Sequence, residues 1–364
     1  MKRKVRVALL FGGKSAEHEI SLISARNIFA AMDKNKYDVV AIGIDKQGRW
    51  FFDEQARLLR GAAQTEVEFG GAKHAAAVLP GDTKIPMVRP ATGAPLRAVD
   101  VAFPVLHGPF GEDGTVQGML KLANVPFVGA GVLGSAVGMD KDVMKRLLRD
   151  AGIPIGKFLV FQREDKKTLS YARIKKRLGL PLFVKPANLG SSVGISKVGS
   201  PSEFRRAVDK AFRYDRKIII EEGIHGREIE CSVLGNEKPV ASLPGEIVVQ
   251  HDFYSYDAKY LDAAGARLAI PARLPKALVK EIQKIALQAY RTLCCEGMAR
   301  VDFFLRPSGQ VLVNEINTIP GFTKISMYPK MWEASGLSYP RLIDRLIRLA
   351  LARARQENRL RSSK

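Results

Sequence analysis

Two apolar runs near the C-terminal end, 301–305 and 311–313, flank the turn Arg-Pro-Ser-Gly, and this pattern predicts a β-hairpin. Asp302 lies in the first strand, and Glu315 and Asn317 end the second. Because side chains alternate between the faces of a strand, Glu315 and Asn317 share one face, and pairing across the hairpin brings Asp302 beside them. A single acidic residue here would simply face water, as most acidic residues do. Several polar side chains on one face of apolar strands instead predict a binding site.

The residue types on this face indicate which ligand it binds. Mg²⁺ prefers oxygen ligands and usually takes a few carboxylates together with nucleotide phosphates. Asp302, Glu315 and Asn317 therefore form a candidate magnesium site. Arg300, two residues before Asp302, lies on the same face and can offer positive charge to a developing oxyanion. We favour the metal site over an ordinary hairpin whose polar residues face water.

Length and composition predict a soluble protein of several domains. A chain of 364 residues is too long for one hydrophobic core, so two or three domains are expected. The apolar run at the start is short, is interrupted by Arg6 and lacks a cleavage site, which argues against a signal peptide. No stretch approaches the roughly 20 apolar residues of a membrane helix. We expect a cytoplasmic protein with no membrane partner, and the three cysteines are expected to be reduced thiols.

The net charge of +21 raises nucleic acid as a partner, but the basic residues are spread along the chain without a basic-aromatic block. They are densest at 341–361, where the apolar spacing predicts an amphipathic helix with a solvated basic face. We therefore interpret the charge as a solvated surface that also attracts an anionic nucleotide, and we expect no nucleic acid.

The order of strands and helices predicts a mixed α/β and α+β protein. In the first unit, the expected strands are 5–11, 39–44, 99–106 and 125–128, the expected helices are 21–32 and 115–123, and 60–97 is a surface excursion. The second unit has helices 141–151, 168–178 and 201–212 and strands 157–161, 182–186, 194–198 and 217–222. The third has strands 227–234 and 240–248, helix 275–293, the hairpin and a closing helix, 339–358. The polar stretch 251–269 shows no periodicity and is interpreted as a lid.

Two polar motifs lie beside expected helices of the first unit. Glu17 precedes the helix after the first strand, where a carboxylate either favours the helix N-terminus or holds a substrate ammonium. His107 opens the loop His-Gly-Pro-Phe-Gly-Glu-Asp-Gly, whose glycines let the backbone approach a ligand. The helix that follows this loop favours an anion such as a carboxylate at its N-terminus. Alone, His107 would more often be a hydrogen-bonding loop residue than a catalyst.

The second unit carries residues suited to a nucleotide. Lys185 lies in an apolar strand and the turn Ser191-Ser192-Val193-Gly194 follows it, so that backbone amides and hydroxyls can surround phosphates while Lys185 and Lys141 offset their charge. Glu221 lies at the end of the expected strand 217–222, where a carboxylate can contact the adenine or ribose. Taken singly, each has an ordinary alternative: a lysine that reaches water, a weak turn motif, or a solvated strand end.

In this order the motifs resemble those of the D-alanine–D-alanine ligases, a family of the ATP-grasp superfamily. The resemblance covers nearly the whole chain, and its most specific stretches are 107–114 and 300–321. It implies a three-domain ATP-grasp architecture with an N-terminal parallel-sheet domain, and ATP held between the other two domains. The expected domains are a substrate-binding domain, 1–134, a central ATP-grasp domain, 135–225, and a catalytic domain, 226–364, with 251–269 as its closing loop.

The resemblance also implies roles for individual residues. The metal ligands are Asp302, Glu315 and Asn317, with two Mg²⁺ ions expected and Mn²⁺ as a substitute. The nucleotide contacts are Lys141, Lys185, Ser191, Ser192, Glu221, Glu228 and Lys259. The residues that bind the amino-acid substrates are Glu17, His107, Lys259, Tyr260, Arg300 and Ser326, and those that take part in the reaction are Glu17, Ser191, Tyr260, Arg300, Gly321 and Ser326. Glu222 departs from relatives that have lysine there, so its role is left open.

The implied activity is the ATP- and Mg²⁺-dependent joining of two D-alanine molecules through an acyl phosphate, for peptidoglycan precursor synthesis. A homodimer is implied as well. One alternative is a ligase that joins D-alanine to D-lactate; Lys259-Tyr260 resembles the dipeptide-forming members, whereas ester-forming members tend to differ at the tyrosine. The other alternative is a nucleotide-sensing protein without catalysis, which loss of a metal ligand would indicate, and all three predicted ligands are present.

Overall fold

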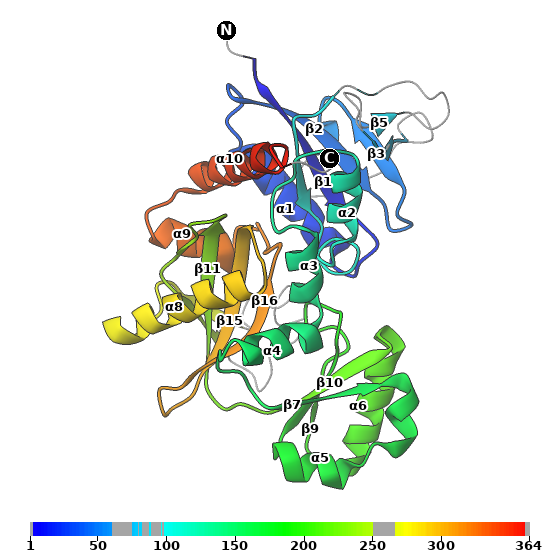
Figure 1. The fold of residues 1–364 in the computed structure, drawn as a ribbon, viewed down its shortest axis with the longest axis vertical. Coiled ribbons are helices and arrows are strands. Elements are labelled where there is room, and N and C mark those ends of the chain that lie inside the picture. The colour runs from blue at the N-terminus through cyan, green and yellow to red at the C-terminus, as the bar shows by residue number, and fades with distance from the viewer. Residues whose placement is uncertain are drawn as a thin grey trace.

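The computed structural model describes residues 3–59, 75–78, 80–81, 87–88, 96, 98–249 and 266–360. Its strands form three main sheets, which follow one another along the long axis of the molecule (Figure 1). Each main sheet falls within one of the three domains expected from the sequence, although the domain boundaries themselves stay a prediction.

The N-terminal sheet has the strand order β3-β2-β1-β6. β1 (Val5–Gly12) pairs in parallel with β2 (Tyr37–Ile44) and with β6 (Val101–Val105), which confirms the predicted parallel sheet. The run of buried residues along β1 reflects helix packing on both faces. The helices are α1 (His18–Ala31) and α2 (Thr115–Leu122), with the turn η1 (Arg57–Leu59) nearby.

Two expectations for this region were wrong in detail. β3 (Trp50–Asp53), which pairs antiparallel with β2 at the sheet edge, was not expected. The expected strand 125–128 is reduced to a single bridge between Phe127 and Ala102, because Pro126 has no N–H to extend the ladder. Within the expected surface excursion, the described residues include the short pair β4 (Ala77–Val78) and β5 (Met87–Val88).

The central sheet has the order β7-β10-β8-β9 and is antiparallel throughout. Its strands are β7 (Phe158–Gln162), β8 (Leu182–Pro186), β9 (Ser196–Val198) and β10 (Lys217–Glu222). The short helix η3 (Arg163–Thr168) precedes α5 (Tyr171–Leu178), and α5 and α6 (Pro201–Tyr214) share one apolar core with the sheet. β8 and β9 form the expected hairpin around the glycine-serine turn.

The C-terminal sheet has the order β14-β13-β11-β15-β16. Its strands are β11 (Arg227–Gly235), β13 (Gly245–Val249), β14 (Ala266–Ala269), β15 (Gly297–Leu305) and β16 (Val311–Asn317), and the short β12 (Val240–Ala241) pairs with β11. α8 (Lys276–Thr292) packs against the sheet in a large apolar core. The expected strand 240–248 is divided between β12 and β13, since Pro244 offers no N–H to the ladder.

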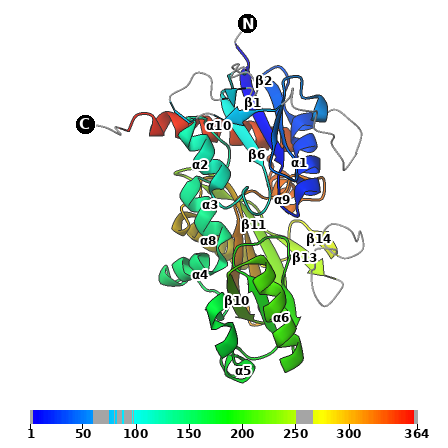
Figure 2. The ribbon, with the colours of Figure 1, turned by 90° about the vertical axis from the view of Figure 1, so that its right-hand side faces the viewer.

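Three helices that connect the units were not all expected. α3 (Val132–Met139) was missed because its sequence is short and rich in glycine, whereas α4 (Lys141–Asp150) was predicted. Figure 2 shows α2, α3 and α4 following one another down one side of the molecule.

Within the described parts of the chain, every helix is too short or too polar to span a lipid bilayer. The three cysteines are free thiols, as predicted.

The last two helices return to the N-terminal sheet. α9 (Met327–Ala334) was missed, and α10 (Tyr339–Glu357) confirms the predicted closing helix, with Arg341, Arg345 and Arg348 exposed on its outer face. Leu342, Ile343 and Leu346 of α10 share one core with residues of β1 and α1. In Figure 1, α10 lies beside α1 at the N-terminal end of the molecule. The first and last segments of the chain therefore fold as one body.

Arg353 of α10 links this helix to the loop after β6. Its guanidinium donates to the carbonyl oxygens of Phe127 (2.8 Å) and Gly129 (2.7 Å) and lies over the Phe127 ring. We expect Arg353→Met to lower the free energy of unfolding by about 2–4 kcal/mol, because two carbonyl oxygens lose a charged donor in a buried place. Thermal denaturation measures this loss. Arg348→Met is the matched control: Arg348 is exposed and forms a surface ion pair with Asp344, so an equal loss there would contradict the assignment.

Candidate active site

The hairpin of β15 and β16 has the predicted register. Asp302 lies opposite Glu315, and Arg300 lies opposite Asn317. An irregularity in pairing after Asp302 inserts an extra residue, Asn314, and keeps Glu315 and Asn317 on the face of Asp302. On the opposite face, the side chains of β15 pack into the apolar core. The expectation that these polar groups share one face is confirmed.

Arg300 lies between two carboxylates on this face. Its Nε and Nη2 each donate to an oxygen of Asp302 at 2.7 Å, and its Nε lies 2.9 Å from Glu230 Oε2. Burial disfavours the charge on Arg300, but Asp302 and then Glu230 outweigh it and raise the pKa of the guanidinium. Arg300 is therefore a fixed, permanently charged donor at the centre of the face.

Glu230 was missed by the sequence reasoning. It lies on β11 directly opposite Asp302 and is only 5% exposed. The available signal was its spacing of two from Glu228, which places both on one face of a predicted strand. Sequence alone does not tell which strand lies beside the hairpin, so this neighbour could not be assigned.

The predicted metal ligands offer a suitable but partial donor set. Among the described residues, no group of three or more His, Cys, Asp or Glu side chains is arranged to hold a metal ion. The predicted set contains only two side chains of these types, Asp302 and Glu315, because its third ligand, Asn317, is an amide. Carboxylate and amide oxygens are the ligand types that Mg²⁺ prefers, so this donor set fits a divalent ion that also binds phosphate oxygens.

The glycine-serine turn lies within reach of this face. Ser191 (φ 49°), Ser192 (φ 60°) and Gly194 (φ 76°) adopt left-handed backbone conformations, which turn successive N–H groups into a concave surface suited to anions. Lys141, at the start of α4, donates to the carbonyl oxygen of Leu189 in this turn (2.6 Å) and lies 3.7 Å from Glu315. Lys141 thus links the turn to the hairpin of β15 and β16.

Lys185 and Glu221 face each other across β8 and β10. Lys185 Nζ lies 2.5 Å from one oxygen of Glu221, and Lys145 of α4 lies 2.9 Å from the other. Burial opposes ionisation of Glu221, but the two ammonium groups outweigh it and lower its pKa to about 2. Lys185 is 8% exposed and does not reach for water, which removes the alternative considered for it. Lys145 was missed, since no sequence motif includes it.

The neighbouring glutamates have separate environments. Glu222 Oε1 accepts the backbone N–H of Lys157 (2.8 Å) and lies 3.2 Å from Arg306. The residue whose role was left open therefore has a structural contact with the chain before β7. Glu228 lies on β11 opposite Phe304, on the same strand face as Glu230.

Glu17 is buried and joins the N-terminal unit to the glycine-serine turn. Its carboxylate accepts a hydrogen bond from the Ser191 hydroxyl and is 8% exposed. Gly108 approaches from the other side: a Cβ at this position, where φ is +74°, would lie 2.8 Å from Glu17 Oε2. Although Glu17 precedes α1, its side chain forms no cap hydrogen bond. Its position favours the ligand-holding interpretation over the helix-terminus one.

His107 contacts the segment that follows the hairpin. Its Nδ1 lies 3.0 Å from the carbonyl oxygen of Ile319, and its Nε2 lies 3.5 Å from the hydroxyl of Ser24. Burial lowers the pKa of His107, which favours the neutral ring. Its contacts are those of a histidine that positions the loop.

Gly321 and Ser326 are brought together at the start of α9. A Cβ at Gly321 would lie 2.8 Å from the Ser326 hydroxyl oxygen, so only glycine fits without a shift. Ser326 Oγ accepts the backbone N–H of Thr323 (2.9 Å), which closes the turn between them. Both residues follow the hairpin that carries Arg300, as the resemblance implies. Lys259 and Tyr260 lie outside the described residues.

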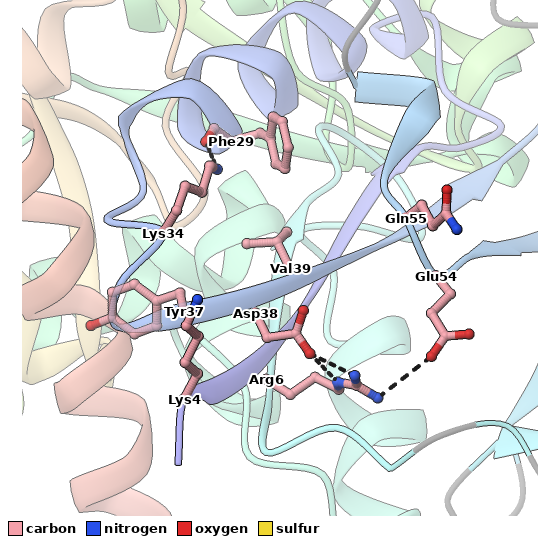
Figure 3. Close-up of a pocket in the computed structure, with 9 residues that line it drawn as sticks. All are labelled: Lys4, Arg6, Phe29, Lys34, Tyr37, Asp38, Val39, Glu54 and Gln55. Atoms are coloured by element: carbon pink, nitrogen blue, oxygen red, sulfur yellow. Dashed lines mark hydrogen bonds and ion pairs between the residues drawn. The ribbon is translucent and has the colours of Figure 1, made fainter. Parts of the chain in front are cut away.

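The predicted site does not coincide with a groove on the surface of the N-terminal sheet. That groove, of about 780 Å³, is lined by Lys4, Arg6, Phe29, Lys34, Tyr37, Asp38, Val39, Glu54 and Gln55. Figure 3 shows Arg6 reaching both Asp38 and Glu54. The charge of Arg6 is thus balanced within the protein, and the groove includes no predicted site residue. A second cavity, of about 500 Å³, lies between the end of α4, β7 and α5 and likewise includes none.

Comparisons with known proteins agree with this geometry. Residues 6–130 match the family described as D-ala D-ala ligase N-terminus, and residues 147–348 match D-ala D-ala ligase C-terminus. A D-alanine–D-alanine ligase of Shouchella clausii is 55% identical over 99% of this chain and 98% of its own length. D-alanine–D-alanine ligase A of Escherichia coli K12 is 54% identical over 99% of both chains.

Solved structures resemble the whole chain as well. The D-alanine–D-alanine ligase of Coxiella burnetii has a TM-score of 0.86 and 43% identity, over 98% of this chain and 96% of that chain. A D-Ala:D-Ser ligase of Enterococcus faecalis has a TM-score of 0.83 and 37% identity, over 96% of this chain and 100% of that chain. With both family regions matched and relatives similar over their full length, the chain belongs to the D-alanine–D-alanine ligase family, which has the ATP-grasp fold.

Proposed function

We propose that the chain joins two D-alanine molecules to D-alanyl-D-alanine, with ATP cleaved to ADP and phosphate. The observation that carries the proposal is the polar face of the hairpin, where Arg300 is held by two carboxylates beside Glu315 and Asn317. Family membership supports it, since full-length relatives carry the name of this activity.

ATP is the second part of the proposal. Lys141, Lys185 and the Ser191–Ser192 turn supply positive charge and N–H groups for phosphates, and Glu228 is assigned to the ribose. Glu221 is assigned to the adenine side of the site, where it also holds Lys185 and Lys145 in place. The proposed ligands of Mg²⁺ are Asp302, Glu315 and Asn317, with two ions expected and Mn²⁺ as a substitute. When bound, such an ion offsets negative charge on the phosphates.

The first chemical step forms an acyl phosphate. A carboxylate is a poor acyl donor, so one of its oxygens attacks the γ-phosphorus of ATP, the bond to the β-phosphate oxygen breaks, and ADP leaves. Glu17 holds the ammonium of this first D-alanine, and the hydroxyl of Ser191 fixes the orientation of Glu17. Lys141 and Lys185 stabilise the transferred charge.

The second step forms the peptide bond. The amine of a second D-alanine, as the free base, attacks the acyl carbon, loses a proton and displaces phosphate. Arg300 and the N–H of Gly321 stabilise the oxyanion of the tetrahedral intermediate, while Ser326 binds the carboxylate of the second D-alanine. Because an acyl phosphate hydrolyses, the site must exclude water. We assign that role, with Lys259 and Tyr260, to the part of the predicted lid 251–269 that precedes β14, because residues 266–269 are a strand of the C-terminal sheet and not part of a lid.

Fold does not decide the second substrate, since a ligase named for D-serine shares this architecture at 37% identity. We expect a D-alanine preference, on the resemblance at Lys259-Tyr260. The test supplies Mg·ATP with D-alanine alone, with added D-lactate or D-serine, or with L-alanine as the control, and identifies products by mass. D-alanyl-D-alanine as the main product in every mixture with D-alanine supports the proposal. A D-alanyl ester with D-lactate would place the chain with the ester-forming ligases.

The setting of the reaction follows from its substrates. D-Alanine and ATP are cytoplasmic small molecules, so we place the protein in the cytoplasm, where its product enters peptidoglycan precursors. We further propose a homodimer, as the family resemblance implies. Sedimentation velocity measures its mass directly, and a 40.1 kDa particle at micromolar concentration would contradict the dimer.

A further inference from the structure

Glu112 is a buried carboxylate that none of the roles above uses. It lies in the loop between β6 and α2 and is 7% exposed. One oxygen accepts the backbone N–H of Gly108 at 2.7 Å, and the other accepts the backbone N–H of Ile319 at 3.3 Å. A single side chain therefore bridges the substrate-side loop of the N-terminal sheet and the segment after the hairpin of β15 and β16.

The Ile319 end of this bridge leads to the oxyanion site. Ile319 lies two residues before Gly321 and two after Asn317, and its carbonyl oxygen is held by His107. Phe322, next to Gly321, donates its backbone N–H to Ser24 at 3.2 Å. The N-terminal unit thus contacts the backbone on both sides of Gly321. On the hairpin side, Glu112 shares the Ile319 N–H with Asn317 Oδ1, which lies 3.1 Å away, and so joins His107 in holding this residue.

The Gly108 end of the bridge leads to the ammonium site. The backbone at Gly108 passes so close to Glu17 that no side chain fits between them. Through its hydrogen bond to Gly108, Glu112 holds this backbone against the carboxylate that binds the first substrate. One oxygen of Glu112 therefore holds the backbone at Gly108, and the other holds the backbone at Ile319. In the proposed reaction the acyl group lies between these two segments.

We propose that Glu112 is a positioning residue that sets the distance between the Gly108 loop and the Gly321 turn, and so aligns the acyl carbon held by Glu17 with the oxyanion-binding N–H. The inference rests on the proposed function. It predicts a specific defect: misalignment slows attack by the amine more than formation of the acyl phosphate, and water then captures part of the intermediate.

The test compares Glu112→Gln with Asp113→Asn. Gln keeps the length of the side chain and one acceptor oxygen, but its amide nitrogen cannot accept the second N–H. Asp113 accepts the N–H groups of Phe110, in the same loop, and of Thr115, at the start of α2, and among the described residues its hydrogen bonds reach no other unit, so it is the matched control. For each variant, kcat, KM for D-alanine, the phosphate-to-dipeptide ratio and the melting temperature are measured on the full chain.

We expect Glu112→Gln to lower kcat by about 10–100-fold, because small displacements from reactive geometry have effects of this size. Phosphate should exceed dipeptide in this variant, while Asp113→Asn keeps the wild-type ratio. Equal phosphate and dipeptide in Glu112→Gln would overturn the inference, as would a lower melting temperature with unchanged kcat per folded enzyme. If the wild type forms no dipeptide, the proposed function fails first, and the inference fails with it.

Discussion

Asp302→Asn should reduce turnover by more than about 10²-fold while leaving the protein folded, because one neutral amide replaces a carboxylate with two roles. Asp302 accepts both N–H groups of the Arg300 fork and is also a proposed metal ligand. An amide oxygen carries less negative charge than a carboxylate oxygen and therefore binds a divalent ion more weakly. The NH₂ group of the new side chain is a donor, so it cannot accept the second N–H of Arg300. Phosphate release at increasing Mg²⁺ concentration measures the effect.

Glu230→Gln is the matched control for this variant. Glu230 faces the same guanidinium at 2.9 Å but is not a proposed metal ligand. We expect a smaller loss of turnover and an unchanged Mg²⁺ requirement in Glu230→Gln, whereas Asp302→Asn needs more Mg²⁺. Near-normal turnover of Asp302→Asn at the wild-type Mg²⁺ concentration would refute the metal assignment.

Arg300→Ala should lower kcat by about 10²–10³-fold, the usual effect of removing one oxyanion donor. The KM for D-alanine should change less, because the interaction is strongest when negative charge develops on the acyl oxygen. Steady-state kinetics on folded protein separates the two constants. A rise in KM with unchanged kcat would assign Arg300 to substrate binding alone.

The same variant should change the pH dependence of stability. Without Arg300, the carboxylate of Asp302 faces the buried carboxylate of Glu230, and their repulsion raises the pKa of one of them above its value in the unfolded chain. Such a group binds its proton more tightly when folded, so its stability contribution is lost as the pH rises through the folded pKa. Melting temperature measured against pH should therefore fall more steeply toward neutral pH in Arg300→Ala than in Arg300→Lys, which keeps the charge.

Local patterns predicted the hairpin of β15 and β16 well, since strand alternation and one turn determine which residues share a face. Asp302, Glu315 and Arg300 were therefore placed correctly from sequence. The pairing of Glu17 with Ser191 was not predictable in the same way, because 174 positions separate them and only the packing of two units brings them together.

The residues that sequence reasoning missed share this property. Glu112 and Ile319 are 207 positions apart, and Glu230 meets Asp302 only because β11 lies beside β15. The return of α10 to the N-terminal sheet is likewise a long-range contact, although its amphipathic pattern was clear from sequence. Sequence patterns identified the elements and the motif residues. The contacts that these residues make with distant parts of the chain depend on the assembled fold.

The central claim is that a carboxylate of D-alanine is activated as an acyl phosphate before the amine attacks. The most direct measurement supplies D-alanine labelled with ¹⁸O in its carboxylate together with Mg·ATP, and determines the label in the phosphate by mass. The account predicts one ¹⁸O atom in the released phosphate for each D-alanyl-D-alanine formed, because the attacking oxygen leaves with phosphorus. Dipeptide formed together with unlabelled phosphate would contradict it.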